Sequence, residues 1–442
     1  MAAGAPVNGL QDMTLQRRQK LMGASGPAAL YIGMGAWVGT LLNGFMAEAA
    51  RRKYGILIAT GVIIQATAIS VGPSAIVGGR FITGVGVGSL SMIVPMYNAE
   101  VTAPEVRGSL IALQQLAICT GIKISFWIDY GTNYIVGTGA SQSDAAWLVP
   151  ICLQLFPAVI LFAGILFMPF SPRWLVHHGR EGGIRKEIKA QSLFEKRSVA
   201  ELWPGLQELT WMNTAKLQFV AIGSLFKTKA MLKRVVVATV TMFFQQWTGI
   251  NAILYYAPTI FASLGLLSSN TVTLLATGVV GIAENPILNI GSIGMTTCHI
   301  IIAVIIAKNR DSWEDHKAAG WAAMAMVWLF VIHFGYSWGP CAWILVAEIW
   351  PLSNRPYGIA LGASSNWMNN FIVCQVTPDM LSGISYGTYI IFELLTYMGA
   401  AFIWWGVPET KRLGLEEMDL VFGSEGVGRN DIARMEGSGY QW

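Results

Sequence analysis

The sequence predicts an all-α protein that crosses a membrane many times, and three observations support this fold class. Hydrophobic residues make up 54% of the 442 residues and charged residues only 12%, whereas soluble domains carry about a quarter charged residues. Apolar segments recur along the chain at lengths near the roughly 20 residues that a helix needs to cross the bilayer core. These segments lack the alternation of polar and apolar residues that is typical of membrane barrel strands.

Ten apolar segments are long enough to cross the bilayer as helices. Five precede a polar stretch, 171–234, and five follow it, so we expect two helical bundles joined by a linker of short helices. A further apolar piece, 271–283, is too short to cross alone. The ten segments cover about 27–48, 55–73, 75–100, 109–132, 145–169, 235–261, 286–307, 320–343, 357–380 and 384–407.

Lys and Arg in the connections indicate the orientation, because cytoplasmic loops are enriched in both. They follow the first segment at 51–53 and the third at Arg107, and the 171–234 stretch holds twelve of them. The alternate connections, 131–146 and 262–271, hold none. The predicted organisation is therefore an N-terminal tail over 1–26, an N-terminal transmembrane bundle over 27–170, a cytoplasmic helical linker over 171–234, a C-terminal transmembrane bundle over 235–407 and a cytoplasmic C-terminal tail over 408–442.

Two places disagree with this orientation, and both predict that chain is missing. Three basic residues within 17–20 precede a first segment that would have to enter from outside, so we expect one more span ahead of residue 27. If the apolar residues on both sides of 283–286 together crossed the membrane once, Arg355 would lie outside, against the charge rule. If they crossed it twice, one of the two crossings would have only about half the required length. A gap in the chain at that junction explains the second disagreement.

No pattern in the sequence is typical of an enzyme, a metal site, a cofactor site or a nucleic-acid-binding surface. The five histidines lack metal-ligand spacing, and no Ser–His–Asp order is evident. The run GVGVG at 84–88 lies inside an apolar segment, which favours close helix packing over phosphate binding. Five cysteines lie in apolar stretches without CxxC spacing, and we interpret them as buried small apolar residues: Cys119, Cys152, Cys298, Cys341 and Cys374.

Polar residues gather inside the apolar run between Phe243 and Phe261. Amides in hydrocarbon are costly unless they have partners, so we expect these side chains to face a wet cavity or other helices. Neutral hydrogen-bonding groups beside aromatic rings suit a ligand with many hydroxyls, and suit an ion poorly. The alternative interpretation is polar packing between helices. The polar residues are Gln245, Gln246, Thr248, Asn251, Tyr255 and Tyr256.

Helical geometry divides this group. At roughly 100° per residue, one helical face collects four of them within an arc of about 140°: Gln245, Asn251, Tyr255 and Tyr256. Gln246 lies outside that arc unless the helix loosens near Gly249, and glycine permits such loosening.

Seven sequence motifs, in order, resemble those of the sugar porter family of the major facilitator superfamily, and among its members the chain is most similar to fungal hexose transporters. The resemblance covers nearly all of the chain from about residue 32 to 421. The motifs are GFMAEAARRKYG (44–55), GRFITGVGVG with VPMYNAEVTAPEVRG (79–108), SPRWLVHHGR (171–180), QQWTGINAILYY (245–256), GPCAWILVAEIWP (339–351), SSNWMNNF (364–371) and PETKRLGLEEMD (408–419).

The resemblance implies the major facilitator fold of two helical bundles, here lacking the first helix and part of helices 8 and 9. It implies transport of a hexose, a glucose-like monosaccharide, by alternating access, either facilitative or coupled to a proton. We expect a monomer in the lipid bilayer, with the plasma membrane as its location. Carried over residue by residue, the resemblance implies that the sugar binds Gln115, Gln245, Gln246, Asn251, Trp343, Asn366 and Asn370.

The residues themselves favour part of this set. Asn366 and Asn370 are spaced four apart and share one helical face. Trp343 offers a flat apolar wall with an N–H donor, or alternatively an anchor at the membrane interface. Charges at the cytoplasmic ends are candidate gates, because opposite charges can lock two bundles together and separate as they open. Topology signalling is the alternative for these charges: Glu48, Arg52, Glu100, Arg107, Arg173, Glu348 and Arg355.

Two other hypotheses compete with transport. A sugar sensor would bind and signal without transport, but such family members usually bear long C-terminal tails, and about twenty residues follow Asp419 here. The missing pieces favour the other hypothesis, an inactive truncated product of a transporter gene. The sequence leaves open whether the substrate is glucose, xylose, galactose, a polyol or quinate. Lys123 and Glu393 lie inside apolar segments and are interpreted as snorkelling or cavity-facing, with a role in proton movement as the alternative.

Overall fold

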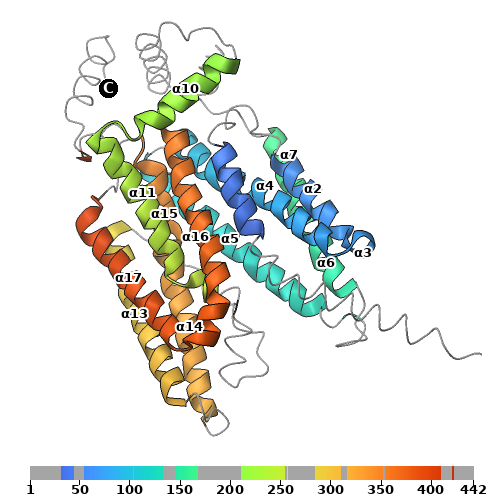
Figure 1. Ribbon diagram of the computed structural model, residues 1–442, viewed down its shortest axis with the longest axis vertical. Coiled ribbons are helices and arrows are strands. Elements are labelled where there is room, and N and C mark those ends of the chain that lie inside the picture. The colour runs from blue at the N-terminus through green and yellow to red at the C-terminus, as the bar shows by residue number, and fades with distance from the viewer. Residues whose placement is uncertain are drawn as a thin grey trace, which may run out of the picture.

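The computed structural model is all-helical in the residues that it describes, and these helices form two groups (Figure 1). The helices before α10 (Trp211–Ser224) and those after it lie on opposite sides of the molecule, and α10 lies at one end. The described residues are 31–43, 54–102, 104–132, 135, 145–167, 211–253, 256, 284–309, 316–351, 354–409 and 421–422.

Each predicted apolar segment corresponds to helix in the described part of the chain. The first group contains a helix over 31–43, α2 (Tyr54–Ala66), α3 (Ala68–Val71), α4 (Pro73–Val101), α5 (Pro104–Thr132), α6 (Ala145–Leu153) and α7 (Leu155–Phe167). The second group contains α11 (Lys229–Trp247), α13 (Glu284–Asn309), α14 (Lys317–Tyr336), α15 (Trp338–Glu348), α16 (Arg355–Gly383) and α17 (Gly387–Gly406).

Several stretches of helix are apolar and long enough to cross a membrane. Within the described residues, four meet this criterion by length and composition: Ser74–Asn98, Ile287–Asn309, Lys317–Glu348 and Gly387–Gly406. Large apolar side chains on the outer faces, such as Phe167 and Trp405, are 87% and 81% exposed. Such exposure is costly in water and favourable against lipid, which agrees with a multi-pass membrane protein.

The segment boundaries differ from the sequence prediction in two places. The predicted segment 320–343 is too short, because helix continues to Glu348 and is interrupted at Ser337, which has φ −113° and ψ −95°. The predicted segment 145–169 is two helices, α6 and α7, on either side of Gln154. The interpretation of all cysteines as buried is also wrong, because Cys152 on α6 is exposed. In a membrane this side chain can face lipid, which an apolar thiol tolerates.

The glycine run GVGVG on α4 lets the 31–43 helix approach closely, so the predicted close packing is confirmed. A Cβ placed at Gly84 would lie 2.4 Å from the carbonyl oxygen of Ile32, and one at Gly88 would lie 2.0 Å from that of Ala36. Both distances are too short for any side chain carbon. Only glycine permits this backbone contact, as in other membrane helix pairs.

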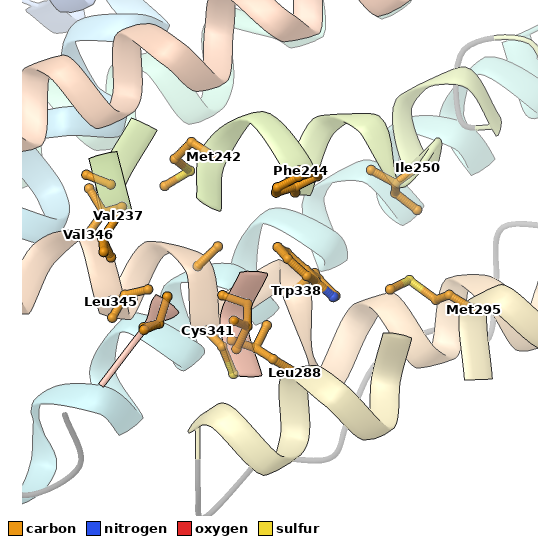
Figure 2. Packing of buried hydrophobic residues seen from close by; sticks show 14 of the residues in the cluster. Val237, Met242, Phe244, Ile250, Leu288, Met295, Trp338, Cys341, Leu345 and Val346 are labelled. Atoms are coloured by element: carbon orange, nitrogen blue, oxygen red, sulfur yellow. The ribbon is translucent and has the colours of Figure 1, made fainter. Parts of the chain in front are cut away.

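The main buried core lies among the helices of the second group (Figure 2). Trp338, at the start of α15, is fully buried and lies between α11 and α13. Its indole Nε1 donates to Oγ of Ser292 on α13 at 2.7 Å. Phe244 of α11 belongs to the same core. This packing fixes the positions of α11, α13 and α15, which carry or surround the candidate site.

Candidate functional site

The break in α11 is the first feature of the candidate site. The helix begins after Thr228, whose Oγ1 accepts from the backbone N–H of Met231 at 3.2 Å, and it ends at Trp247. Gly249 follows with φ +89°, a conformation that residues with a side chain rarely adopt, and helix resumes at Ile250. The loosening near Gly249 that would let Gln246 join the other polar residues is therefore present.

Five amides from α11, its continuation and α16 lie together, and we call them the amide cluster: Gln245, Gln246, Asn251, Asn366 and Asn370. Oε1 of Gln246 accepts from Nδ2 of Asn251 and faces Nδ2 of Asn370 at 3.5 Å. Oε1 of Gln245 accepts from Nδ2 of Asn366. The two glutamines thus each pair with one asparagine of α16. Asn251 is half-buried, whereas the other four are buried.

Within the amide cluster, the side chain of Gln245 has the most hydrogen-bond partners in the protein. Its Nε2 donates to the backbone carbonyl oxygens of Trp338 at 2.8 Å and Gly339 at 3.3 Å, next to the break between α14 and α15. Both of its N–H groups are therefore engaged. Polar packing between helices, the alternative interpretation, accounts for this donor side of Gln245. Asn251 differs, because the described residues give its Oδ1 no hydrogen-bond partner.

α5 approaches the cluster at Gly339. A Cβ placed at Gly339 would lie 3.7 Å from Nε2 of Gln115 on α5. Trp343, one turn further along α15, is half-buried and packs against the small cluster of Ile111, Ile344 and Ala347, in which Ile111 lies one turn before Gln115. Gly339 therefore lies close to α5, and its carbonyl oxygen accepts from Gln245. Of the seven residues carried over as sugar ligands, five form the amide cluster, Gln115 lies near Gly339, and Trp343 packs beside α5.

Sequence reasoning missed several polar residues near this group. Oε1 of Gln114 is buried and has no hydrogen-bond partner in the described part of the chain. Asn369 accepts from Nε1 of Trp247 at 3.0 Å and so ties α16 to α11. The doubled letters QQ at 114–115 and NN at 369–370 are the only sequence signal for these two. His299 of α13, which contacts the break in α11 at the carbonyl oxygen of Thr248, gave no signal.

The candidate gating charges are only partly described. Glu48, Arg52 and Arg173 lie outside the described residues, and so do the side chains of Glu100 and Arg107. The remaining two are Glu348, the last residue of α15, and Arg355, the first residue of α16. Glu348 and Arg355 are both buried, and Arg355 donates to the backbone carbonyl of Trp350 at 3.1 Å. Tyr255 and the side chain of Lys123 also lie outside the described residues.

A model of the family described as sugar (and other) transporter matches residues 24–422. A probable quinate permease of Aspergillus flavus is 31% identical over 409 residues, covering 86% of this chain and 75% of the relative. The quinate permease of Neurospora africana is 31% identical over 402 residues, covering 84% and 73%.

Solved structures share the fold. The proton:xylose symporter XylE, a major facilitator protein bound to 6-bromo-6-deoxy-D-glucose, superposes with a TM-score of 0.70 at 24% identity, covering 90% of this chain and 89% of that one. The fucose:proton symporter FucP of E. coli gives a TM-score of 0.54 at 13% identity, covering 90% and 94%. At these identities the likeness shows the fold, and the major facilitator fold predicted from the sequence is confirmed.

Proposed function

Since the chain belongs to the sugar (and other) transporter family, whose members are membrane transporters and not enzymes, we propose that it carries a hexose across the membrane by alternating access. The substrate is a glucose-like monosaccharide, and transport is facilitative or coupled to a proton. The protein works as a monomer in the plasma membrane. The two helical groups act as the N-terminal bundle, 27–170, and the C-terminal bundle, 235–407, with the cytoplasmic linker 171–234 between them.

The observation that carries this proposal is the amide cluster at the broken part of α11. Its five neutral side chains, from α11, its continuation and α16, pair with one another and include both hydrogen-bond donors and acceptors. A monosaccharide needs such mixed partners, because each hydroxyl both donates and accepts. In the proposed site, the cluster and Gln115 bind the hydroxyls and Trp343 stacks on the C–H face of the ring.

Asn251 and Gln246 are the members best placed to exchange partners with a sugar. Asn251 is the least buried of the cluster, and its Oδ1 lacks a partner within the described residues. The contact between Gln246 and Asn370 is long, at 3.5 Å, and therefore weak. A sugar hydroxyl that replaces the weak contact between Gln246 and Asn370 gains more binding free energy than one that replaces the hydrogen bonds of Gln245.

The proposed gate consists of the charges at the cytoplasmic ends of the helices: Glu48, Arg52, Glu100, Arg107, Arg173, Glu348 and Arg355. Opposite charges hold the two bundles together in one state and separate in the other. Burial of Glu348 and Arg355 supports this part, because buried charges interact strongly with their surroundings.

Quinate transport is the second candidate, and the names of the relatives favour it. Quinate is a ring with several hydroxyls, like a sugar, but it also bears a carboxylate. The amide cluster can bind its hydroxyls, whereas a carboxylate gains most from a cationic partner. None of the described side chains hydrogen-bonded within the cluster is Lys or Arg, which favours the neutral sugar.

Uptake of radiolabelled glucose by cells that lack their own hexose uptake tests the proposal. Replacing Gln246→Leu removes an acceptor shared by two asparagines, so we expect the KM for uptake to rise about tenfold, the equivalent of one good hydrogen bond. Gln65→Leu is the matched control, because Gln65 is equally buried but bonds to Thr83 and Gly61 within the first group. That control should leave KM unchanged.

Competition by unlabelled glucose, galactose, xylose, a polyol and quinate then identifies the substrate. Displacement of labelled glucose by hexoses supports the proposal. Uptake of labelled quinate with no glucose uptake contradicts it and supports the second candidate. Sugar binding to purified protein without uptake into proteoliposomes would instead indicate a sensor.

A further inference from the structure

His299 of α13 makes a buried contact with the broken part of α11. The side chain is fully buried, and its Nε2 lies 3.0 Å from the backbone carbonyl oxygen of Thr248. A carbonyl oxygen can only accept, so Nε2 carries the hydrogen and donates. The contact joins residues 51 positions apart in the sequence. It therefore arises from tertiary packing and not from local helix geometry.

Thr248 occupies the position at which α11 loses its regular hydrogen bonding. Carbonyl groups at the end of a helix lack partners within the helix and need others. The side chain of Thr248 turns back, with Oγ1 donating to the carbonyl oxygen of Gln245 at 2.8 Å. His299 contacts the carbonyl of the same residue. Thr248 is two residues from Gln246 and three from Asn251, so fixing its peptide constrains both amides.

Aromatic rings hold the imidazole in place. The centroid of the His299 ring lies 4.6 Å from that of Phe330 and 6.2 Å from that of Phe392. Phe392 of α17 also covers the break, because a Cβ placed at Gly249 would lie 2.9 Å from its ring. α13 and α17 thus contact the break together, His299 through a hydrogen bond and Phe392 through packing.

We propose that His299 is a positioning residue for the sugar site. By donating to Thr248 it holds the break in the conformation in which Gln246 faces Asn251 and Asn370. His299 does not itself contact the sugar. The role rests on the proposed function, in which the amide cluster binds the substrate.

The second ring nitrogen of His299, Nδ1, is buried and makes no hydrogen bond within the described residues. A buried polar atom without a partner destabilises a protein, and an apolar ring of similar size would avoid that cost. The bond from Nε2 to Thr248 is the interaction that offsets it.

Two substitutions separate the hydrogen bond from the volume of the side chain. His299→Gln keeps an N–H donor at about the reach of Nε2, whereas His299→Leu removes it. We expect the leucine variant to raise the KM for labelled sugar about tenfold while the maximal rate per surface molecule stays within about twofold. The glutamine variant should stay within about twofold of the native KM.

His333→Leu is the matched control. His333 is half-buried on the neighbouring α14, and its Nδ1 lies 2.6 Å from the hydroxyl of Tyr336 on the same helix. It contacts no member of the break by hydrogen bonding in the described residues. The control variant should therefore keep the native KM. Should His299→Leu not reach the membrane, His299→Asn replaces it, because the shorter amide does not reach the carbonyl.

Hydrogen–deuterium exchange of the purified protein supplies a readout that needs no transport. The loss of the donor should speed exchange in a peptide covering 243–253, and the glutamine variant should not. Equal impairment of the leucine and glutamine variants, or native KM and exchange in the leucine variant, would overturn the role of His299. If the native protein transports no sugar, but the leucine variant still exchanges faster than the native protein over 243–253, only the proposed function is overturned.

Discussion

Gly249 is the residue on which the geometry of the amide cluster depends. Its φ of +89° is readily available to glycine and strained for every L side chain. A Cβ there would also meet the ring of Phe392 at 2.9 Å. Backbone strain and steric contact therefore act in the same direction at this position. A side chain at residue 249 must either distort the break or displace α17.

Gly249→Ala should therefore weaken both folding and sugar binding. We expect a loss of about 1–3 kcal/mol in stability, from the strained conformation and the contact with Phe392. Thermal unfolding in detergent and the KM for uptake measure the two effects. Gly121→Ala on α5 is the control, because nothing lies within 4 Å of a Cβ placed there. An alanine variant at 249 as stable as this control would show that the break tolerates a side chain.

Residue spacing predicted part of the amide cluster, because three of its members lie close together in the sequence. The spacing of Gln245, Gln246 and Asn251 on one helix required a loosening at Gly249, and glycine identity made that loosening possible. The donation from Gln245 to Trp338 and Gly339 could not be predicted, because it needs a second break in a different segment. His299 was missed for the same reason, since its partner is a backbone atom far away in sequence.

At the scale of helices, the interruption between α14 and α15 is a feature that hydropathy alone cannot locate. The apolar stretch Lys317–Glu348 is continuous in composition, yet the helix is interrupted at Ser337. Pro340 lacks the backbone N–H that would continue the helix from Tyr336. Gly291 on α13 then lets the bend pack closely, because a Cβ at that position would lie 2.1 Å from Oγ and 2.3 Å from Cβ of Ser337.

Gly291→Ala should thus force α13 and the bend apart. Overpacking of this kind costs about 1–3 kcal/mol, so we expect a lower midpoint of thermal unfolding in detergent. The double variant Gly291→Ala with Ser337→Gly removes both of the closest clashing atoms and should recover much of the loss. A single variant with the native midpoint would contradict the tight contact, and so would a double variant no better than the single one.

At the scale of the whole molecule, the two helical groups meet through a few specific contacts. Nε1 of Trp37 donates to Oγ of Ser364 at 2.9 Å, and Nε1 of Trp367 donates to Oγ of Ser91 at 2.9 Å. Both bonds join α16 to helices of the first group. Sequence predicted two bundles from the polar stretch between them, but not these pairs. In the proposed alternating-access cycle, contacts between the bundles belong to one state, and hydropathy and motif spacing carry no information about that state.

Alternating access requires such contacts to separate in every cycle, and a disulfide across the bundles tests this. A Cβ placed at Gly33 would lie 3.5 Å from Cβ of Phe371, within the range that a disulfide spans. In a background whose five native cysteines are alanine, Gly33→Cys with Phe371→Cys should lose uptake under oxidation and regain it on reduction. Uptake by the oxidised and the reduced form is measured in the same cells, which separates the effect of the cross-link from the effect of the substitutions.

Ala238→Cys with Gly362→Cys is the matched pair, because a Cβ at Gly362 would lie 3.6 Å from Cβ of Ala238 and both residues belong to the second group. Oxidation of that pair should leave uptake unchanged, since α11 and α16 move together as one bundle. Uptake that persists when the pair at 33 and 371 is fully cross-linked would mean that the bundles need not part at this contact. The sugar would then have to pass the amide cluster by a movement inside the second bundle, centred on the breaks at Gly249 and Ser337.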